Sequence, residues 1–296
     1  TDVAAAVEEL MAGEKAEHFG NIHRTFEDGE RLVTTPPYTA YLKIAEGCSN
    51  GCAFCIIPKL RGRYRSRSME ALLAEARQLA DSGVKELIVI AQDITRYGMD
   101  LEEPTSLAGL LKELCKLDFH WIRLHYLYPE VITDELIDTI AREKKIVHYL
   151  DIPIQHCNDG ILKAMRRRNT RAELEDLFDR LRRAIPYLVV RTSLICGLPG
   201  EGEAEFEELC QFLREQKLQR VGVFQFSPEE GTLAAAMEDQ VDPETAARRV
   251  ELVVDLQSRI MDEYNEARLG TVMEVLCEGF DAQAGCFAGR TYADSV

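Results

Sequence analysis

Short apolar runs alternate with amphipathic stretches over most of the chain. Six short runs are rich in branched and aromatic residues, as buried strands are: residues 41–44, 86–91, 121–126, 147–152, 188–195 and 220–226. Between them, apolar residues recur at helical spacing over residues 69–82, 105–117, 133–143, 158–184 and 203–217. Strands that alternate with helices pair in parallel through right-handed crossovers, so this pattern predicts an α/β fold.

The number of strand–helix units narrows the architecture. A closed barrel of this type has eight units, whereas this chain shows six. The pattern therefore predicts an open, partial (βα)6 TIM-like barrel, with the chemistry at the carboxyl ends of the strands. Capping residues support the helices. Ser68 precedes the first helix, Gly83 follows it, and Thr170 with Glu173 forms a capping box.

The segments outside this pattern suggest domain boundaries. Residues 1–36 hold a short Ala/Glu-rich helix and a polar linker, and residues 37–242 form the core. Residues 243–268 form a long C-terminal helix with one apolar stripe. Residues 269–296 read as a strand and a glycine-bearing turn that do not complete a domain. The chain also begins without methionine, so we expect it to be part of a longer protein.

Three cysteines follow the first predicted strand in one short loop. Three residues separate Cys48 from Cys52, and two separate Cys52 from Cys55. Three soft thiolates from one loop suit an iron–sulfur cluster, and such a cluster keeps one iron without a protein ligand. The alternative is a zinc site with a fourth ligand from elsewhere. Structural zinc usually uses paired CxxC units, and the sequence has no second pair.

The other cysteines are scattered singly, and we expect them to be small core residues: Cys115, Cys157, Cys196, Cys210, Cys277 and Cys286. Nine cysteines is an odd number and the sequence gives no sign of export, so we expect no disulfides.

The charge narrows the possible partners. The formal net charge is −16, which disfavours nucleic-acid binding, because phosphate recognition usually needs a basic face. An acidic surface instead favours a basic protein partner. No apolar run approaches the roughly 20 residues that span a bilayer, and the first residues lack a signal-peptide pattern. We therefore expect a cytoplasmic protein that has no membrane segment.

Several motifs together resemble the methylthiotransferase branch of the radical S-adenosylmethionine (SAM) superfamily. The similarity runs from about residue 38 to the end of the chain. The motifs are residues 41–48, 55–62, 91–98, 151–156, 191–201 and 226–232.

Within that branch, residues 123–129 and 289–294 are most similar to members that methylthiolate an aspartate β-carbon of a small-subunit ribosomal protein. The acidic charge fits this basic substrate, and a tRNA methylthiotransferase is the alternative. A binding module with a purely structural cluster is an alternative from another class. The resemblance also implies an N-terminal domain that holds a second 4Fe-4S cluster, and a C-terminal TRAM domain. Residues 1–36 and 269–296 would be remnants of these two domains, so we expect this chain alone to cleave SAM without completing methylthiolation.

The resemblance implies that Cys48, Cys52 and Cys55 hold a 4Fe-4S cluster whose fourth iron binds SAM. A flavodoxin-type reductant would supply one electron, and SAM cleavage would give a 5′-deoxyadenosyl radical.

The resemblance also implies SAM contacts, which are Phe54, Gln92, Gln155, Arg191 and Gly197. We expect Gln155 and Arg191 at strand ends. Phe54 is equally well explained as a core aromatic residue, and Arg191 as an ion-pair partner.

Two further features have a plain structural interpretation. We expect His156 to be a hydrogen-bonded structural histidine rather than a proton carrier. The basic run Lys59, Arg61, Arg63, Arg65 and Arg67 is either a solvated loop or a surface that attracts the substrate or the reductant.

Overall fold

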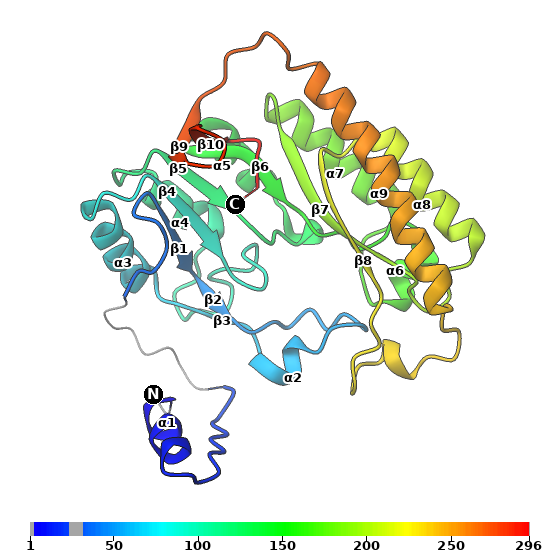
Figure 1. Cartoon of the computed structure of the whole chain (residues 1–296), viewed down its shortest axis with the longest axis horizontal. Coiled ribbons are helices and arrows are strands. Elements are labelled where there is room, and N and C mark those ends of the chain that lie inside the picture. The colour runs from blue at the N-terminus through cyan, green and yellow to red at the C-terminus, as the bar shows by residue number, and fades with distance from the viewer. Residues whose placement is uncertain (1–2, 24–31, 296) are drawn as a thin grey trace.

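The computed structural model describes residues 3–23 and 32–295. Its centre is a six-stranded sheet in which every neighbouring pair of strands is parallel. The order is β1 (Thr39–Lys43), β4 (Glu86–Ile90), β5 (Trp121–Leu124), β6 (Ile146–Asp151), β7 (Val189–Cys196) and β8 (Arg220–Gln225). Strands β1 and β8 form the two edges of the curved sheet (Figure 1). This open arrangement confirms the predicted partial barrel of six units.

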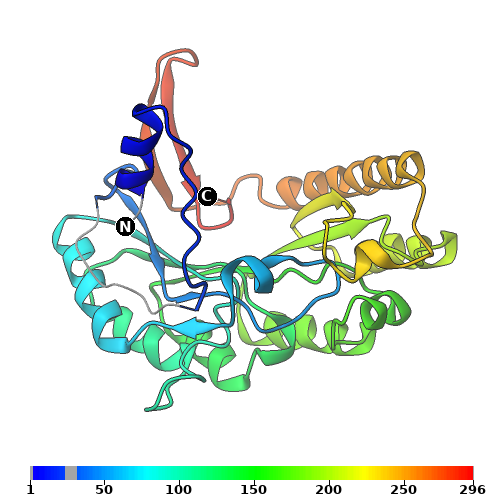
Figure 2. The same ribbon diagram turned by 90° about the horizontal axis from the view of Figure 1, so that it is seen from below.

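Helices pack along the outside of the curved sheet (Figure 2). They are α3 (Met69–Asp81), α4 (Leu107–Leu114), α5 (Asp134–Arg142), α6 (Asp159–Ala164), α7 (Arg171–Ala184), α8 (Glu203–Gln216) and α9 (Pro243–Glu266). The predicted caps are present: Ser68 accepts from the Ala71 N–H, and Thr170 with Glu173 forms the capping box. The helical pattern over 158–184 forms two helices, and the capping box at Thr170 and Glu173 marks the start of the second. Arg166 has a φ of 55°, which ends α6, and the capping box then starts α7.

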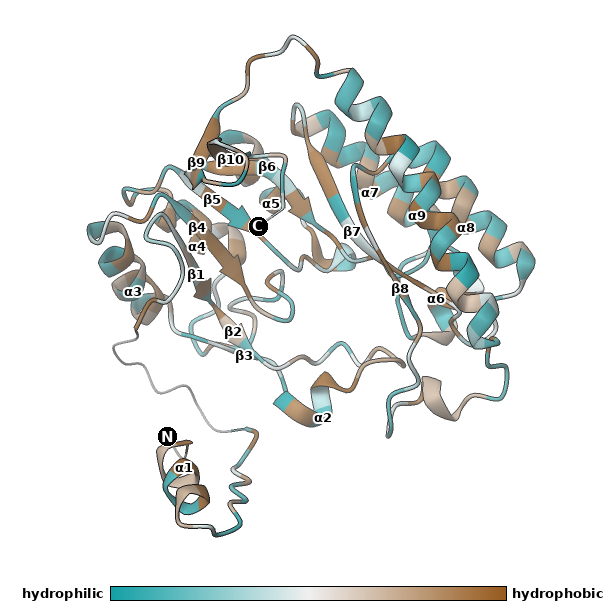
Figure 3. Cartoon of the chain, in the orientation of Figure 1, coloured by the Kyte–Doolittle hydropathy of each residue, from teal (hydrophilic) through white to brown (hydrophobic). Residues whose placement is uncertain are grey.

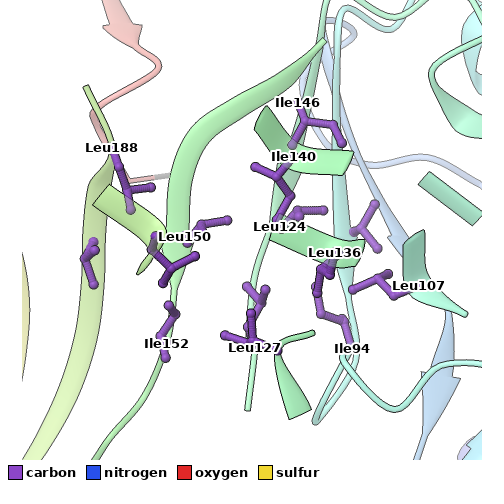
Figure 4. Close-up of a cluster of buried hydrophobic side chains, with 14 of the residues drawn as sticks. Ile94, Leu107, Leu124, Leu127, Leu136, Ile140, Ile146, Leu150, Ile152 and Leu188 are labelled. Carbon is purple, nitrogen blue, oxygen red and sulfur yellow. The ribbon is translucent and has the colours of Figure 1, made fainter. Parts of the chain in front are cut away.

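The main core lies between the sheet and these helices. Figure 4 shows part of it, where branched side chains of strands β5 and β6 meet those of α4 and α5. Figure 3 shows hydrophobic strands (brown) beside helices that have hydrophilic faces (teal), which is the alternation from which the fold was predicted. Cys157, Cys196 and Cys210 are buried as expected, whereas Cys277 and Cys286 are exposed. That expectation fails for the last two, which lie at exposed positions of a two-stranded hairpin.

Smaller elements complete the chain. The described residues also form α1 (Val3–Met11), α2 (Ile57–Arg61), and the 3₁₀ helices η1 (Pro129–Val131) and η2 (Ala234–Ala236). Two short strands, β2 (Ala45–Glu46) and β3 (Arg65–Ser66), pair beside the cysteine loop. The antiparallel hairpin of β9 (Val275–Asp281) and β10 (Cys286–Thr291) follows α9. Among the described residues, no helix has the length and apolarity needed to cross a membrane.

The last residues pack against the amino ends of the central strands. Ala293 belongs to a small buried cluster with Trp121 and Tyr149. Arg290 of β10 donates from Nη2 to Glu86 Oε2 at 2.7 Å, and Arg123 donates from Nε to Glu86 Oε1 at 2.8 Å. The side chains of Glu86 and Arg123 are both 0% exposed. This buried ionic contact joins the C-terminal hairpin to the amino ends of the strands, whereas the cysteine loop lies at their carboxyl ends.

Candidate functional site

The three cysteines of the loop share one cavity of about 470 Å³. The residues around it come from the cysteine loop and the start of α2, from the carboxyl ends of β1, β4, β5 and β6, from one residue of β7, and from the segment after α6. The lining consists of Lys43, Cys48, Asn50, Cys52, Phe54, Cys55, Ile57, Ile90, Ala91, Gln92, Tyr126, Tyr128, Pro153, Gln155, Arg167 and Ser193. The site therefore lies at the carboxyl ends of the strands, as the strand–helix pattern predicts.

The cysteine loop is held in place by polar contacts from the loop after β4. Asn50 donates from Nδ2 to Asp93 Oδ2 at 2.9 Å, and its Oδ1 accepts from Arg96 Nε at 2.8 Å. Asp93 is completely buried and also accepts from the Thr95 N–H at 3.0 Å. Because Asn50 sits between Cys48 and Cys52, this network holds the cysteine loop against the loop after β4.

The thiols themselves are partly buried. Burial raises the pKa of the Cys48 thiol to about 11, and the Asp93 carboxylate acts in the same direction. Burial also raises the pKa of the Cys55 thiol. Iron binds the thiolate form, so cluster binding here must release these protons.

The arrangement of the sulfurs suits a cluster. Among the described residues, no three His, Cys, Asp or Glu side chains converge as ligands of a single ion. In a cluster each thiolate binds its own iron, so the three sulfurs need only face the same cavity, as they do here. Three soft thiols around an enclosed space of this volume fit that group.

Phe54, Gln92 and Gln155 line the cavity as predicted. Phe54 also packs against the buried cluster that contains Ala53, which fits its interpretation as a core aromatic residue, while the SAM contact stays a prediction. Gln92 donates from Nε2 to Glu46 Oε1 at 3.2 Å, while its buried Oε1 has no hydrogen-bond partner among the described residues. Gln155 has a φ of 72°, a strained conformation for a non-glycine residue, and strained residues often mark functional sites.

Glu46 stands beside Gln92 and stays ionised. Burial alone would raise the pKa of Glu46, but a hydrogen bond from Lys43 and its charge, the Gly47 N–H and Arg61 together lower it.

Arg191 and Gly197 do not line the cavity. Arg191 is not at the end of its strand as expected, because β7 continues to Cys196. Its Nη1 lies 2.6 Å from Asp151 Oδ1, which is the predicted ion-pair alternative. Gly197 has a φ of 82°, and a Cβ there would lie 2.4 Å from the Cβ of Ala246. Gly197 therefore allows α9 to approach the loop after β7.

His156 is a buried structural residue, as predicted. Its Nδ1 accepts from the Asn158 N–H at 3.0 Å, and its Nε2 lies 3.5 Å from Glu201 Oε2.

The basic run is mostly tied to its own chain. Lys59 donates to the Gly231 carbonyl at 2.5 Å, and Arg67 pairs with Glu75 at 2.6 Å. Arg61 and Arg63 are exposed.

Arg167 and Tyr128 are two of the cavity residues that the sequence did not reveal. Residues 166–168 are three consecutive arginines, and the sequence alone predicts an ordinary polar segment between helices there. The structure buries the middle one to 6% exposure beside Cys52. Tyr128 is buried next to it, and its hydroxyl lies 3.4 Å from Cys52 Sγ. No local pattern distinguishes Arg167 from Arg166 and Arg168.

Comparison with known proteins agrees with this geometry. The family described as the radical SAM superfamily matches residues 42–213. The ribosomal protein uS12 methylthiotransferase RimO of Caldanaerobacter subterraneus is 48% identical over 100% of this chain and 67% of its own length. The protein of the same name from Myxococcus xanthus is 51% identical over 84% of this chain and 52% of its own length. The chain thus spans about half to two thirds of these relatives.

Solved structures show the same fold at low identity. Coproporphyrinogen III oxidase (HemN) from Escherichia coli, a radical SAM enzyme, has a TM-score of 0.56 at 16% identity, covering 76% of this chain and 53% of its own. The radical SAM methyltransferase TsrM from Kitasatospora setae has a TM-score of 0.53 at 16% identity, covering 63% and 36%. The chain belongs to the radical SAM superfamily and, within it, to the family of the uS12 methylthiotransferase RimO.

Proposed function

We propose that the full-length protein is a radical SAM transferase that adds a methylthio group to an aspartate β-carbon of ribosomal protein uS12. The observation that carries this proposal is the similarity to uS12 methylthiotransferases, 48% identity along the whole chain, together with one cavity lined by all three loop cysteines. In this proposal the present chain supplies the radical-generating step. Methylthiolation itself needs the rest of the full-length protein, where a second 4Fe-4S cluster would supply the sulfur.

In this function Cys48, Cys52 and Cys55 hold a 4Fe-4S cluster as thiolates. When bound, this group supplies the electron that cleaves SAM and so gives the 5′-deoxyadenosyl radical. The chain's own residues position the loop, through Asn50 and Asp93, and enclose the reacting atoms.

Polar and aromatic residues of the cavity would hold SAM. The unpartnered Oε1 of Gln92 is an acceptor for the SAM amino group, and Gln155 adds polar contacts on the facing side. Phe54, next to Cys55, offers an apolar face to the adenine. Arg191 and Gly197 lie outside the cavity lining, so we assign them supporting roles. Arg191 pairs with Asp151, and Gly197 leaves the space into which α9 packs.

The test of this function uses cysteine variants of the chain, reconstituted without oxygen. Cys52→Ala should lose both the cluster absorbance and the formation of 5′-deoxyadenosine. Cys286→Ala, which removes an exposed cysteine of the hairpin, should keep both and serves as the control. If Cys52→Ala keeps both, the assignment of the loop is wrong.

The substrate is decided with the full-length protein. Incubation with uS12 and with tRNA, followed by mass spectrometry, should show the methylthio group on uS12 alone. Modification of tRNA alone would replace the proposed function by that of the sister enzymes. The net charge of −16 favours the basic ribosomal protein. A cytoplasmic location, where thiols stay reduced, is part of the same proposal.

The reductant in this proposal is an acidic, flavodoxin-type protein. An acidic chain repels such a partner except at a basic patch, and Arg61 and Arg63 expose their charges close to Cys55 in the chain. Reversing both charges to Glu should slow cluster reduction by flavodoxin and leave reduction by dithionite unchanged. Equal rates with flavodoxin before and after the change would remove this patch from the proposal.

A further inference from the structure

Arg167 lies in the wall of the cavity with its guanidinium turned toward Cys52. Its Nη1 is 3.8 Å from Cys52 Sγ, within hydrogen-bond distance for sulfur, and its Nη2 donates to the Pro153 carbonyl at 2.7 Å. The guanidinium also covers the ring of Tyr128 at 4.0 Å from its centre. The Tyr128 hydroxyl reaches the same sulfur at 3.4 Å. Two donors therefore converge on the sulfur of Cys52.

The charge of Arg167 has no carboxylate to balance it. In the described part of the chain, no Asp or Glu oxygen lies within ion-pair distance of Arg167, although the residue is only 6% exposed. The exposed Arg168 pairs with Glu130, and Arg171 pairs with Glu175. A buried charge is costly unless an opposite charge compensates it. The Arg167 guanidinium instead contacts the sulfur of Cys52.

We propose that Arg167 and Tyr128 are positioning residues that raise the reduction potential of the cluster by donating to the Cys52 sulfur. The inference rests on the proposed function only in requiring a cluster at this loop. Hydrogen bonds and positive charge at a ligand sulfur stabilise the reduced cluster, which carries one more negative charge than the oxidised form. Arg167 supplies both effects, and Tyr128 supplies a hydrogen bond and holds the guanidinium plane by stacking.

The reduction potential of the reconstituted 296-residue chain tests the inference directly. Arg167→Met and Tyr128→Phe are compared with the unchanged chain by EPR-monitored redox titration, with iron counted in each sample. Arg166→Met is the matched control, because it removes the same charge from the neighbouring, exposed residue. At a fixed ambient potential, Arg167→Met should lower the ratio of reduced to oxidised cluster about tenfold. This is about 59 mV for a one-electron couple.

Tyr128→Phe should lower the ratio in the same direction by a smaller factor, and Arg166→Met should leave it unchanged. If Arg167→Met retains the iron content and the potential of the unchanged chain, the inference is overturned. If Arg167→Met fails to bind iron, the reduction potential of Tyr128→Phe is the test instead. A potential in Tyr128→Phe equal to that of the unchanged chain also overturns the inference. Failure of the unchanged chain to bind a cluster contradicts the proposed function instead, so the two failures are distinguishable.

Discussion

The buried carboxylate of Glu86 gives a stability prediction that can be worked out from the structure. Glu86 accepts from Arg123 at 2.8 Å and from Arg290 at 2.7 Å, and its side chain is 0% exposed. Glu86→Gln keeps the shape but removes the negative charge, which leaves the fully buried Arg123 without a carboxylate. Removing one member of a buried pair typically costs about 3–5 kcal/mol. We therefore expect the free energy of unfolding at pH 7 to fall by about that amount.

Urea unfolding of the metal-free chain measures this change, with Glu263→Gln as the control. Glu263 pairs with Lys217 at 2.7 Å, but both side chains are 63% exposed. Such a surface pair contributes about 0–1 kcal/mol. A loss for Glu86→Gln no larger than that of the control would refute the assignment of Glu86 as a buried ionic contact between the hairpin and the sheet.

The pH dependence follows from the same contacts. Burial alone would raise the pKa of Glu86, but the hydrogen bond from Arg290 and the charge of Arg123 outweigh it and lower the pKa. A group with a lowered folded pKa stabilises the fold above its unfolded pKa and loses that contribution as the pH falls through the folded pKa. The difference in the free energy of unfolding between the unchanged chain and Glu86→Gln should therefore stay constant down to about pH 5. It should shrink only below about pH 4.3, the ordinary pKa of glutamate.

Two further predictions concern the packing and the acid stability of the barrel. Gly197→Ala should lower the free energy of unfolding by about 2–5 kcal/mol, since the left-handed backbone and the 2.4 Å contact with Ala246 both oppose a Cβ. Gly270→Ala has a similar φ of 80° and open space around it, so it should cost only about 1–2 kcal/mol; equal losses would contradict the clash. Burial lowers the pKa of His125 to about 4, so stability should fall as the pH drops from about 6.5 toward 4, because only the unfolded chain then binds a proton. His125→Gln should flatten this fall in urea unfolding between pH 7 and 4.5, and an unchanged slope would show that His125 is not the group responsible.

Part of the fold was predictable because some central strands are buried on both faces. Strands β4 and β5 consist almost entirely of buried residues, so each appears in the sequence as a short run that is mostly apolar. The start of α7 was indicated by the capping box at Thr170, but the end of α6 was not, since Arg166 adopts a left-handed conformation without the glycine that usually marks one.

The site was predictable only where it is local in sequence. Cys48, Cys52 and Cys55 lie within one loop, and their spacing alone indicates their chemistry. The expectation of Arg191 at a strand end was wrong, although the apolar run 188–195 already places this residue near the start of β7. The burial of Arg167 depends on a contact with a residue 115 positions away, and the Glu86–Arg290 contact spans 204 positions. Neither contact leaves a periodic signal, so both required the structure.

The central claim is that the cysteine cavity holds a 4Fe-4S cluster with one iron open to SAM. Its most direct test is the EPR spectrum of the reduced, anaerobically reconstituted chain, recorded before and after the addition of SAM. We predict about four irons per chain and a spectrum that changes when SAM binds the open iron. A spectrum that does not respond to SAM would indicate a purely structural cluster, and one zinc per chain in place of iron would contradict the claim outright.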